Sequence, residues 1–178
     1  MKRDTEQENT IRRIFANYKS FALVGMSGNK IRPSYFVGTY LKANHFDFVS
    51  VNPAYDSIFG SPCFKKLEDI DPPPEVVVVF RRADKTPPVA REAVRIGAKV
   101  LWLQFGIRNE ESKKIAEEAG LLFIEDRCVK VEYARYHGNL HQTGFNTGLI
   151  SSRKRKSASF NPADLSASCS INTPNRTS

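Results

Sequence analysis

The stretch Val76-Val77-Val78-Val79-Phe80 decides the fold class of this chain. A strand with one face in water alternates apolar and polar side chains, but this run is apolar at every position. Such a run is typical of a strand that helices cover on both faces, which is the usual environment in a parallel sheet. We therefore expect a central, buried strand here, with helices on either side of the sheet.

On both sides of this strand, short apolar runs alternate with longer amphipathic stretches. The other expected strands are Phe21–Gly25, Phe46–Val51, Val100–Gln104 and Leu122–Glu125. The expected helices are Thr5–Tyr18, Tyr35–Ala43, Pro88–Ile96, Glu110–Ala119 and one near Lys130–Tyr136. Because crossovers between parallel strands are right-handed, this pattern predicts an α/β fold, a doubly wound sheet of about five parallel strands in the order 3-2-1-4-5, flanked by helices.

The residues at the expected helix ends agree with these boundaries. Asn44, Gly97 and Gly120 stand where the carboxyl end of a helix needs a left-handed residue. Asn109 precedes two glutamates, which is typical of an N-cap before an acidic first turn.

The chain of 178 residues changes character near residue 138. Residues 1–138 are expected to form one domain, residues 139–155 a partly ordered extension, and residues 156–178 a disordered polar tail rich in Ser, Thr and Asn. The basic run Arg153–Lys156 is either solvated or a short localisation or polyanion-binding signal.

Composition and charge exclude several classes of protein. The net charge is +8, but half of this excess lies beyond residue 138, so the expected domain is only mildly basic and a dedicated nucleic-acid surface is not indicated. No apolar run approaches the roughly 18 residues of a membrane span, and the charged start predicts a cytoplasmic protein. Cys63, Cys128 and Cys169 are far apart in sequence, which favours reduced thiols over a disulfide framework or a zinc site.

Ligands of an open α/β sheet bind beyond the carboxyl ends of its strands, where the strand order reverses. In the predicted order this point lies between the first strand and the fourth. After the first strand, Gly25 lets the backbone turn close to a ligand, Ser27 supplies a hydroxyl, and a helix starting near Pro33 offers N–H groups to a phosphate. The loop therefore looks like a pyrophosphate cradle. It lacks the spacing Gly-x-Gly-x-x-Gly, and a glycine that serves only to turn the chain is the alternative.

The residues after the second and third strands indicate a ligand rich in phosphate. NAD-binding proteins usually place a carboxylate after the second strand, but here the chain reads Val51-Asn52-Pro53. Lys30 and Arg32 bring positive charge near the first loop instead. Arg81 and Arg82 follow the central strand, where a guanidinium can pair with a phosphate. The alternative for each of these basic side chains is a solvated surface position.

Several motifs that span most of the expected domain carry a family resemblance. They are Val24-Gly25-Met26-Ser27, Arg32-Pro33-Ser34-Tyr35, Val51-Asn52-Pro53, the turn Gly60-Ser61-Pro62-Cys63, Val79-Phe80-Arg81-Arg82, Ile96-Gly97-Ala98-Lys99, Val100-Leu101-Trp102-Leu103-Gln104 and Asp126-Arg127-Cys128. Together, from about Tyr18 to Gly138, they resemble the small single-domain CoA-binding proteins, whose fold is similar to the CoA-binding domain of the succinyl-CoA synthetase α subunit.

The resemblance implies a Rossmann-like domain that holds coenzyme A, free or acylated, at the strand ends. By matching position, Gly25, Met26 and Ser27 would lie against the pyrophosphate, Arg32, Pro33 and Ser34 near the adenosine end, Asn52 and Pro53 by the adenine or ribose, and Phe80, Arg81, Gln104 and Gly106 along the pantetheine.

The same resemblance argues against an enzyme. Succinyl-CoA synthetase forms a phosphohistidine in a second domain, for which this chain has no room, and His45, His137 and His141 stand elsewhere. We therefore predict a CoA-binding protein with no catalytic residue and no metal site. An NADP-linked oxidoreductase or an acyl-CoA-processing enzyme is the alternative, and an interaction adaptor with a vestigial ligand site is a third class. The sequence leaves open whether the protein is a homodimer.

Overall fold

Seven strands form one sheet in residues 5–137, the part of the chain that the computed structural model describes. The five expected strands are present as β1 (Phe21–Val24), β2 (Val49–Val51), β5 (Val76–Val79), β6 (Val100–Leu103) and β7 (Leu122–Ile124). Two further strands, β3 (Ser57–Ile58) and β4 (Ser61–Phe64), were not expected. The predicted extension at residues 139–155 and the predicted tail at residues 156–178 lie outside the described residues.

The strand order is β3-β4-β2-β1-β5-β6-β7, and every pair except β3 with β4 is parallel. The predicted order is wrong at one place. β5 was expected outside the second strand, but it pairs with β1, and β4 occupies the outer position beside β2. β4 is short and contains Pro62, which makes it a weak strand signal in the sequence although proline is tolerated near a sheet edge.

A tight hairpin leads into this missed strand. Phe59 and Gly60 form its two-residue loop with φ angles of 56° and 72°, the left-handed conformation that such hairpin loops favour. The turn that the sequence predicts at residues 60–63 is therefore shorter than expected. Of these four residues only Gly60 lies in the turn, because Ser61 already belongs to β4.

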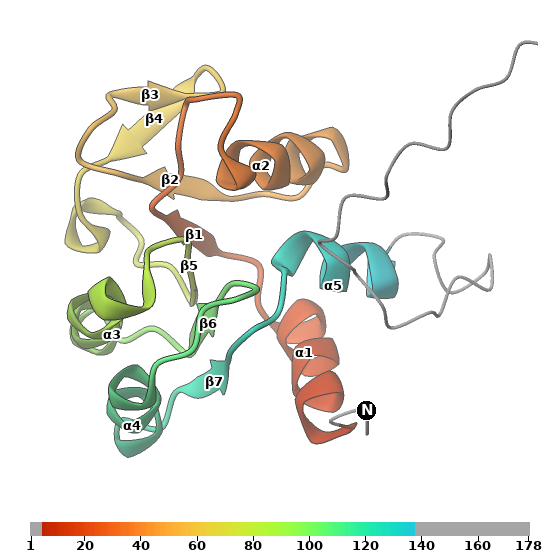
Figure 1. Ribbon diagram of the computed structural model, residues 1–178, viewed down its shortest axis with the longest axis vertical. Coiled ribbons are helices and arrows are strands. Elements are labelled where there is room, and N and C mark those ends of the chain that lie inside the picture. The colour runs from red at the N-terminus through yellow and green to blue at the C-terminus, as the bar shows by residue number, and fades with distance from the viewer. Residues whose placement is uncertain (1–4, 138–178) are drawn as a thin grey trace, which may run out of the picture. The chain divides into compact units, whose positions relative to one another are not determined.

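Helices cover both faces of the sheet, as expected for a doubly wound α/β fold (Figure 1). The helices are α1 (Thr5–Asn17), α2 (Pro33–Ala43), α3 (Thr86–Arg95), α4 (Glu110–Glu118) and α5 (Val129–His137), with short 3-10 turns η1 (Leu67–Asp69) and η2 (Ala83–Lys85). α1, α2 and α5 pack on one face, where Trp102 is fully buried. α3 and α4 pack on the other face. Because β5 is covered on both sides, all four of its valines are buried.

The helix ends confirm most of the predicted boundaries. The side chain of Asn109 accepts a hydrogen bond of 2.7 Å from the N–H of Ser112, so Asn109 is the N-cap of α4. Gly97 and Gly120 have φ angles of 74° and 75°, as predicted. The prediction for Asn44 is wrong, because Asn44 has a φ of −102° and the left-handed residue is His45, with a φ of 56°.

Candidate functional site

The loops that follow β1 and β5 meet at the carboxyl edge of the sheet. The strand that pairs with β1 is β5 and not β6. The reversal of strand order therefore lies between β1 and β5, whereas the sequence predicted it between β1 and β6. The chain leaves β1 toward α2 on one face and leaves β5 toward α3 on the other (Figure 1). This divergence is where open α/β sheets bind their ligands.

Gly25 brings the ends of β1 and β5 into close approach. Its φ is 86°, in the left-handed region, while its N–H still donates to the carbonyl of Val51 at 2.8 Å. A Cβ atom at this position would lie 2.9 Å from Cδ of Arg81 and 3.2 Å from the carbonyl carbon of Phe80. Only glycine fits this backbone without displacement, so three of the predicted binding residues are neighbours in space.

The loop between β1 and α2 is ordered by its own side chains. The hydroxyl of Ser27 accepts from the N–H of Asn29 at 3.1 Å, and the side-chain oxygen of Asn29 accepts from the N–H of Ile31 at 2.9 Å. α2 then begins at Pro33, as predicted, with Arg32 at its N-cap and no side-chain oxygen bonded to the first turn. The start of α2 therefore combines the positive end of a helix with exposed basic side chains at Lys30 and Arg32.

Tyr55 belongs to the same loop cluster, although sequence reasoning did not find it. Its hydroxyl lies 3.1 Å from Oγ of Ser27, and its ring lies so close to Gly28 that a Cβ there would be 3.0 Å from Cε1. Lys65 holds this segment by donating to the backbone carbonyl of Tyr55 at 2.8 Å. The contact between Tyr55 and Ser27 spans 28 positions along the chain, so no local pattern predicts it. The place of Tyr55 shortly after Val51-Asn52-Pro53 is the one feature of the sequence that indicates a role in the site.

The side chain of Asn52 binds to the backbone of the loops in this cluster. Its side-chain amide donates to the carbonyl of Met26 at 2.6 Å, and its side-chain oxygen accepts from the N–H of Ala54 at 3.0 Å. Met26 itself is fully buried, so only its backbone faces the loop, and Pro53 is exposed. The side-chain nitrogen of Asn52 therefore joins the loop after β2 to the loop after β1, and its side-chain oxygen orders the loop after β2 itself.

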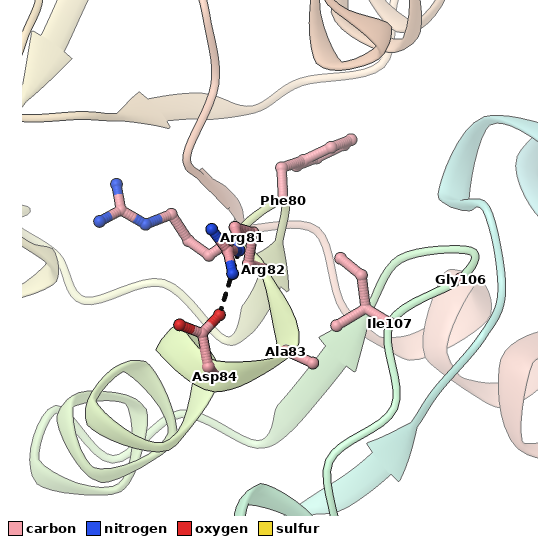
Figure 2. Close-up of a pocket in the computed structure, with 7 residues that line it drawn as sticks. All are labelled: Phe80, Arg81, Arg82, Ala83, Asp84, Gly106 and Ile107. Atoms are coloured by element: carbon pink, nitrogen blue, oxygen red, sulfur yellow. Dashed lines mark ion pairs between the residues drawn. The ribbon is translucent and has the colours of Figure 1, made fainter.

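An open hollow of about 680 Å³ lies between the ends of β5 and β6. Its lining is shown in Figure 2 and consists of Phe80, Arg81, Arg82, Ala83, Asp84, Gly106 and Ile107. Arg82 and Asp84, both exposed, form an ion pair of 3.3 Å. Among the described residues, Arg81 has no carboxylate within ion-pair distance, so of the two arginines it is the one whose charge is available to an anion.

The far wall of this hollow is held by Asp126. Its carboxylate accepts from the N–H of Gly106 and from Arg108, each at 2.7 Å, and its own φ is 55°. Burial by itself would raise the pKa of this carboxyl, but these two hydrogen bonds and the positive charges of Arg108 and Arg127 outweigh it and hold the pKa below its usual value.

The remaining predicted residues are not all open to a ligand. Ser34 is buried at the start of α2, and Gln104 is 5% exposed beyond the end of β6. Arg32 and Pro33 are exposed, and Gly106 lies in the loop after β6 with a φ of 78°.

Within residues 5–137 no three His, Cys, Asp or Glu side chains gather in a way that could hold a metal ion. None of the described helices is both long enough and apolar enough to span a bilayer.

A family model described as a CoA binding domain matches residues 19–134, which include all seven strands and the described helices except α1 and the end of α5. The chain belongs to this family. The CoA binding domain is 36% identical over 124 residues to YneT, an uncharacterized protein of Bacillus subtilis, covering 70% of this chain and 92% of YneT. It is 27% identical over 133 residues to an ADP-forming acetate–CoA ligase of Methanocaldococcus jannaschii, covering 70% of this chain but only 19% of the ligase.

Solved structures agree with this assignment. A hypothetical protein from Pyrococcus horikoshii OT3 is 36% identical to this chain and superposes with a TM-score of 0.69, over 72% of this chain and 91% of that one. The predicted family and the predicted Rossmann-like α/β fold are thereby confirmed, with the strand order corrected as above.

Proposed function

We propose that this CoA binding domain binds coenzyme A at the reversal of strand order and catalyses no reaction on it. The diphosphate lies against Gly25, the loop after β1 and the start of α2. The pantetheine arm crosses the end of β5 toward β6. The membership of the family supports the ligand class, and the similarity to an acetate–CoA ligase is consistent with it.

The observation that carries the proposal is the close approach at Gly25. The backbone there leaves room for a hydrogen only, with Phe80 and the alkyl chain of Arg81 directly beside it. This contact places the Arg81 side chain beside the loop after β1, and the start of α2 adds the positive end of a helix, so the charge that a diphosphate requires is gathered at one place.

The charge around the loop after β1 favours a ligand with an additional phosphate. No acidic side chain follows β2 directly, where a carboxylate would bind ribose hydroxyls, and Asn52 is committed to the backbone. Lys30 and Arg32 are exposed beside the loop. We therefore assign these two side chains to the 3′-phosphate, the group that distinguishes coenzyme A from its dephospho form.

Isothermal titration calorimetry with CoA, dephospho-CoA and NADP tests this proposal. CoA should bind most tightly, and its advantage over dephospho-CoA should shrink with added salt, because exposed charge pairs are screened over about 8 Å at physiological ionic strength. Arg32→Gln should reduce CoA binding about fivefold, in line with roughly 1 kcal/mol for an exposed ion pair, and leave dephospho-CoA binding unchanged.

Arg13→Gln is the matched control, because Arg13 is also exposed but lies on α1, which runs toward the amino end of β1. Equal affinity for CoA and dephospho-CoA would remove the role of the basic loop. Mass spectrometry should recover CoA and acetyl-CoA unchanged after incubation, and turnover of either would refute the absence of catalysis.

A further inference from the structure

Cys128 lies between two residues whose backbone is bound by side chains from the end of β6. The indole N–H of Trp102 donates to the carbonyl of Arg127 at 2.7 Å. The side-chain oxygen of Gln104 accepts from the N–H of Val129 at 3.4 Å. Trp102 and Gln104 are two positions apart, so they share one face of the sheet. Cys128 is thereby fixed on that face, over the carboxyl end of β6.

The thiol of Cys128 is half-buried and forms no disulfide. Cys128 stands at the N-cap of α5, because its carbonyl accepts from the N–H of Glu132 at 3.0 Å and the helix begins at Val129. Sulfur is a weak acceptor compared with the oxygen of Ser, Thr, Asp or Asn, the residues that this position favours. Cysteine is therefore a poor choice of cap here, and what it adds to the position is a reactive thiol.

A buried amide beside this thiol lacks a partner. The Nε2 atom of Gln104 has no hydrogen-bond partner among the described residues, although the residue is only 5% exposed. Since its Oε1 atom faces the N–H of Val129, the amide stands at the start of α5, next to Cys128. A buried donor without an acceptor is unusual in a folded protein and indicates an atom from outside the chain. A ligand therefore reaches the immediate neighbourhood of the thiol.

Glu125 does not supply the missing acceptor. Its Oε2 atom is also buried without a partner among the described residues. In the register of β6 and β7, however, Trp102 pairs with Ile124, so Glu125 points to the face opposite that of Trp102 and Gln104. The unpaired amide is therefore left to a ligand.

The thiol of Cys128 lies within reach of the far end of a coenzyme A held at Gly25. Only β5 separates β6 from β1, so at about 4.8 Å per strand the end of β6 stands roughly 10 Å from the end of β1. The arm of coenzyme A runs from the diphosphate to its own thiol through about twelve bonds, the length of about four residues, and spans at most roughly 14 Å. The sulfur of the bound ligand can therefore meet the Sγ atom of Cys128.

We propose that Cys128 is a site of reversible covalent modification, where the protein takes up one coenzyme A from CoA disulfide; the inference rests on the proposed binding of coenzyme A. The thiolate of Cys128 attacks one sulfur of the disulfide. A bond forms between Sγ and that sulfur, and the bond between the two CoA sulfurs breaks. The second CoA leaves as a thiolate and takes up the proton that the Cys128 thiol released. The Cys128 sulfur is oxidised and the departing sulfur is reduced, so CoA disulfide is the only oxidant required.

The exchange gives the binding site a response to oxidation. Where CoA is present as its disulfide, the reversible complex becomes covalent, and a small thiol releases the ligand again. While the adduct persists, the sulfur of Cys128 is protected from irreversible oxidation. The reaction is stoichiometric and leaves reduced CoA unchanged, so it agrees with the proposed absence of catalysis.

Intact-protein mass spectrometry after incubation with CoA disulfide tests the proposal. We expect one adduct with the mass of one CoA, removed by dithiothreitol and placed on Cys128 by peptide mapping. Cys63 is the internal control, because it lies at 7% exposure on β4 and should stay unmodified. Cys128→Ser should lose the adduct without a fall in melting temperature, since serine is a preferred N-cap. Cys169→Ser should keep it, and an adduct found on Cys63 or Cys169 instead overturns the inference.

The rate of modification separates a bound reagent from a thiol that is merely reactive. CoA disulfide should modify Cys128 at least tenfold faster than glutathione disulfide, because binding holds its sulfur beside the thiol. Adenosine 3′-phosphate 5′-diphosphate, which lacks the arm, should slow the reaction with CoA disulfide and leave the reaction with glutathione disulfide unchanged. Equal rates for the two disulfides, or no effect of the arm-less nucleotide, would disconnect the thiol from the binding site and overturn the inference.

Calorimetry with reduced CoA distinguishes a failure of this inference from a failure of the proposed function. If the wild-type protein binds CoA but forms no adduct with CoA disulfide, the inference is overturned and the proposed function stands. If the wild-type protein binds neither CoA nor the arm-less nucleotide, the proposed function fails and the inference fails with it.

Discussion

Replacing Gly25 by alanine separates backbone strain from steric exclusion. The φ of 86° alone costs an L-residue about 1–2 kcal/mol. The new Cβ would also lie 3.2 Å from the carbonyl carbon of Phe80, which cannot withdraw easily because the N–H of Phe80 donates to Val24 at 2.8 Å. Overpacking of this kind adds about 1–3 kcal/mol, so we expect a total loss of about 2–5 kcal/mol and a protein that still folds.

Gly97→Ala is the matched control for this variant. Gly97 has a φ of 74°, and no atom lies within 4 Å of the position of its Cβ, so the substitution incurs the strain without the contact. Urea denaturation should show Gly25→Ala to be the less stable variant by about 1–3 kcal/mol. Calorimetry should show at least a tenfold loss of CoA affinity for Gly25→Ala and none for Gly97→Ala. Equal destabilisation of the two variants, or normal CoA binding by Gly25→Ala, would refute the reasoning.

Two further predictions concern side chains that hold the site. The hydroxyls of Ser27 and Tyr55 share one hydrogen bond, which leaves one O–H free to donate whichever of them is the donor. Ser27→Ala and Tyr55→Phe should therefore each leave CoA binding nearly unchanged, whereas the double variant should lose about tenfold; a double loss no larger than the product of the two single losses would contradict this donor count. Because the pKa of Asp126 is lowered in the folded state, its contribution to stability is present above the unfolded value of about 3.9 and is lost as the pH falls through the folded value. Asp126→Asn should accordingly flatten the fall in unfolding free energy below about pH 4, and an acid limb as steep as that of the wild type would show that the carboxylate contributes nothing.

The class of fold is determined by local patterns that the sequence shows directly. Burial on both faces requires apolar residues at every position of β5. A helix with one buried face requires apolar residues three or four positions apart. Strands and helices could therefore be predicted from residues that are close together in the sequence. The same holds for Gly97, Gly120 and Asn109, whose backbone or side chain acts within its own helix end. His45 in place of Asn44 shows the limit of this reasoning, because either residue could end the helix and the choice depends on how the chain continues into β2.

The candidate site depends on contacts between segments that are distant in sequence. Local periodicity reports that a strand is buried but not which strand lies beside it, and β4 acquires its place from hydrogen bonds that the backbone of β2 supplies. For the same reason the sequence named Gly25 and Arg81 as candidates but could not bring them together.

The tertiary structure alone decided which polar groups are left for a ligand. Asn52 is spent on the backbone of Met26, Tyr55 reaches Ser27 across 28 positions, and Gln104 is turned into the protein with half of its amide unpaired. The sequence determined which residues lie at the strand ends, because each follows its own strand. Whether such a side chain is satisfied depends on partners that only folding brings within hydrogen-bond distance.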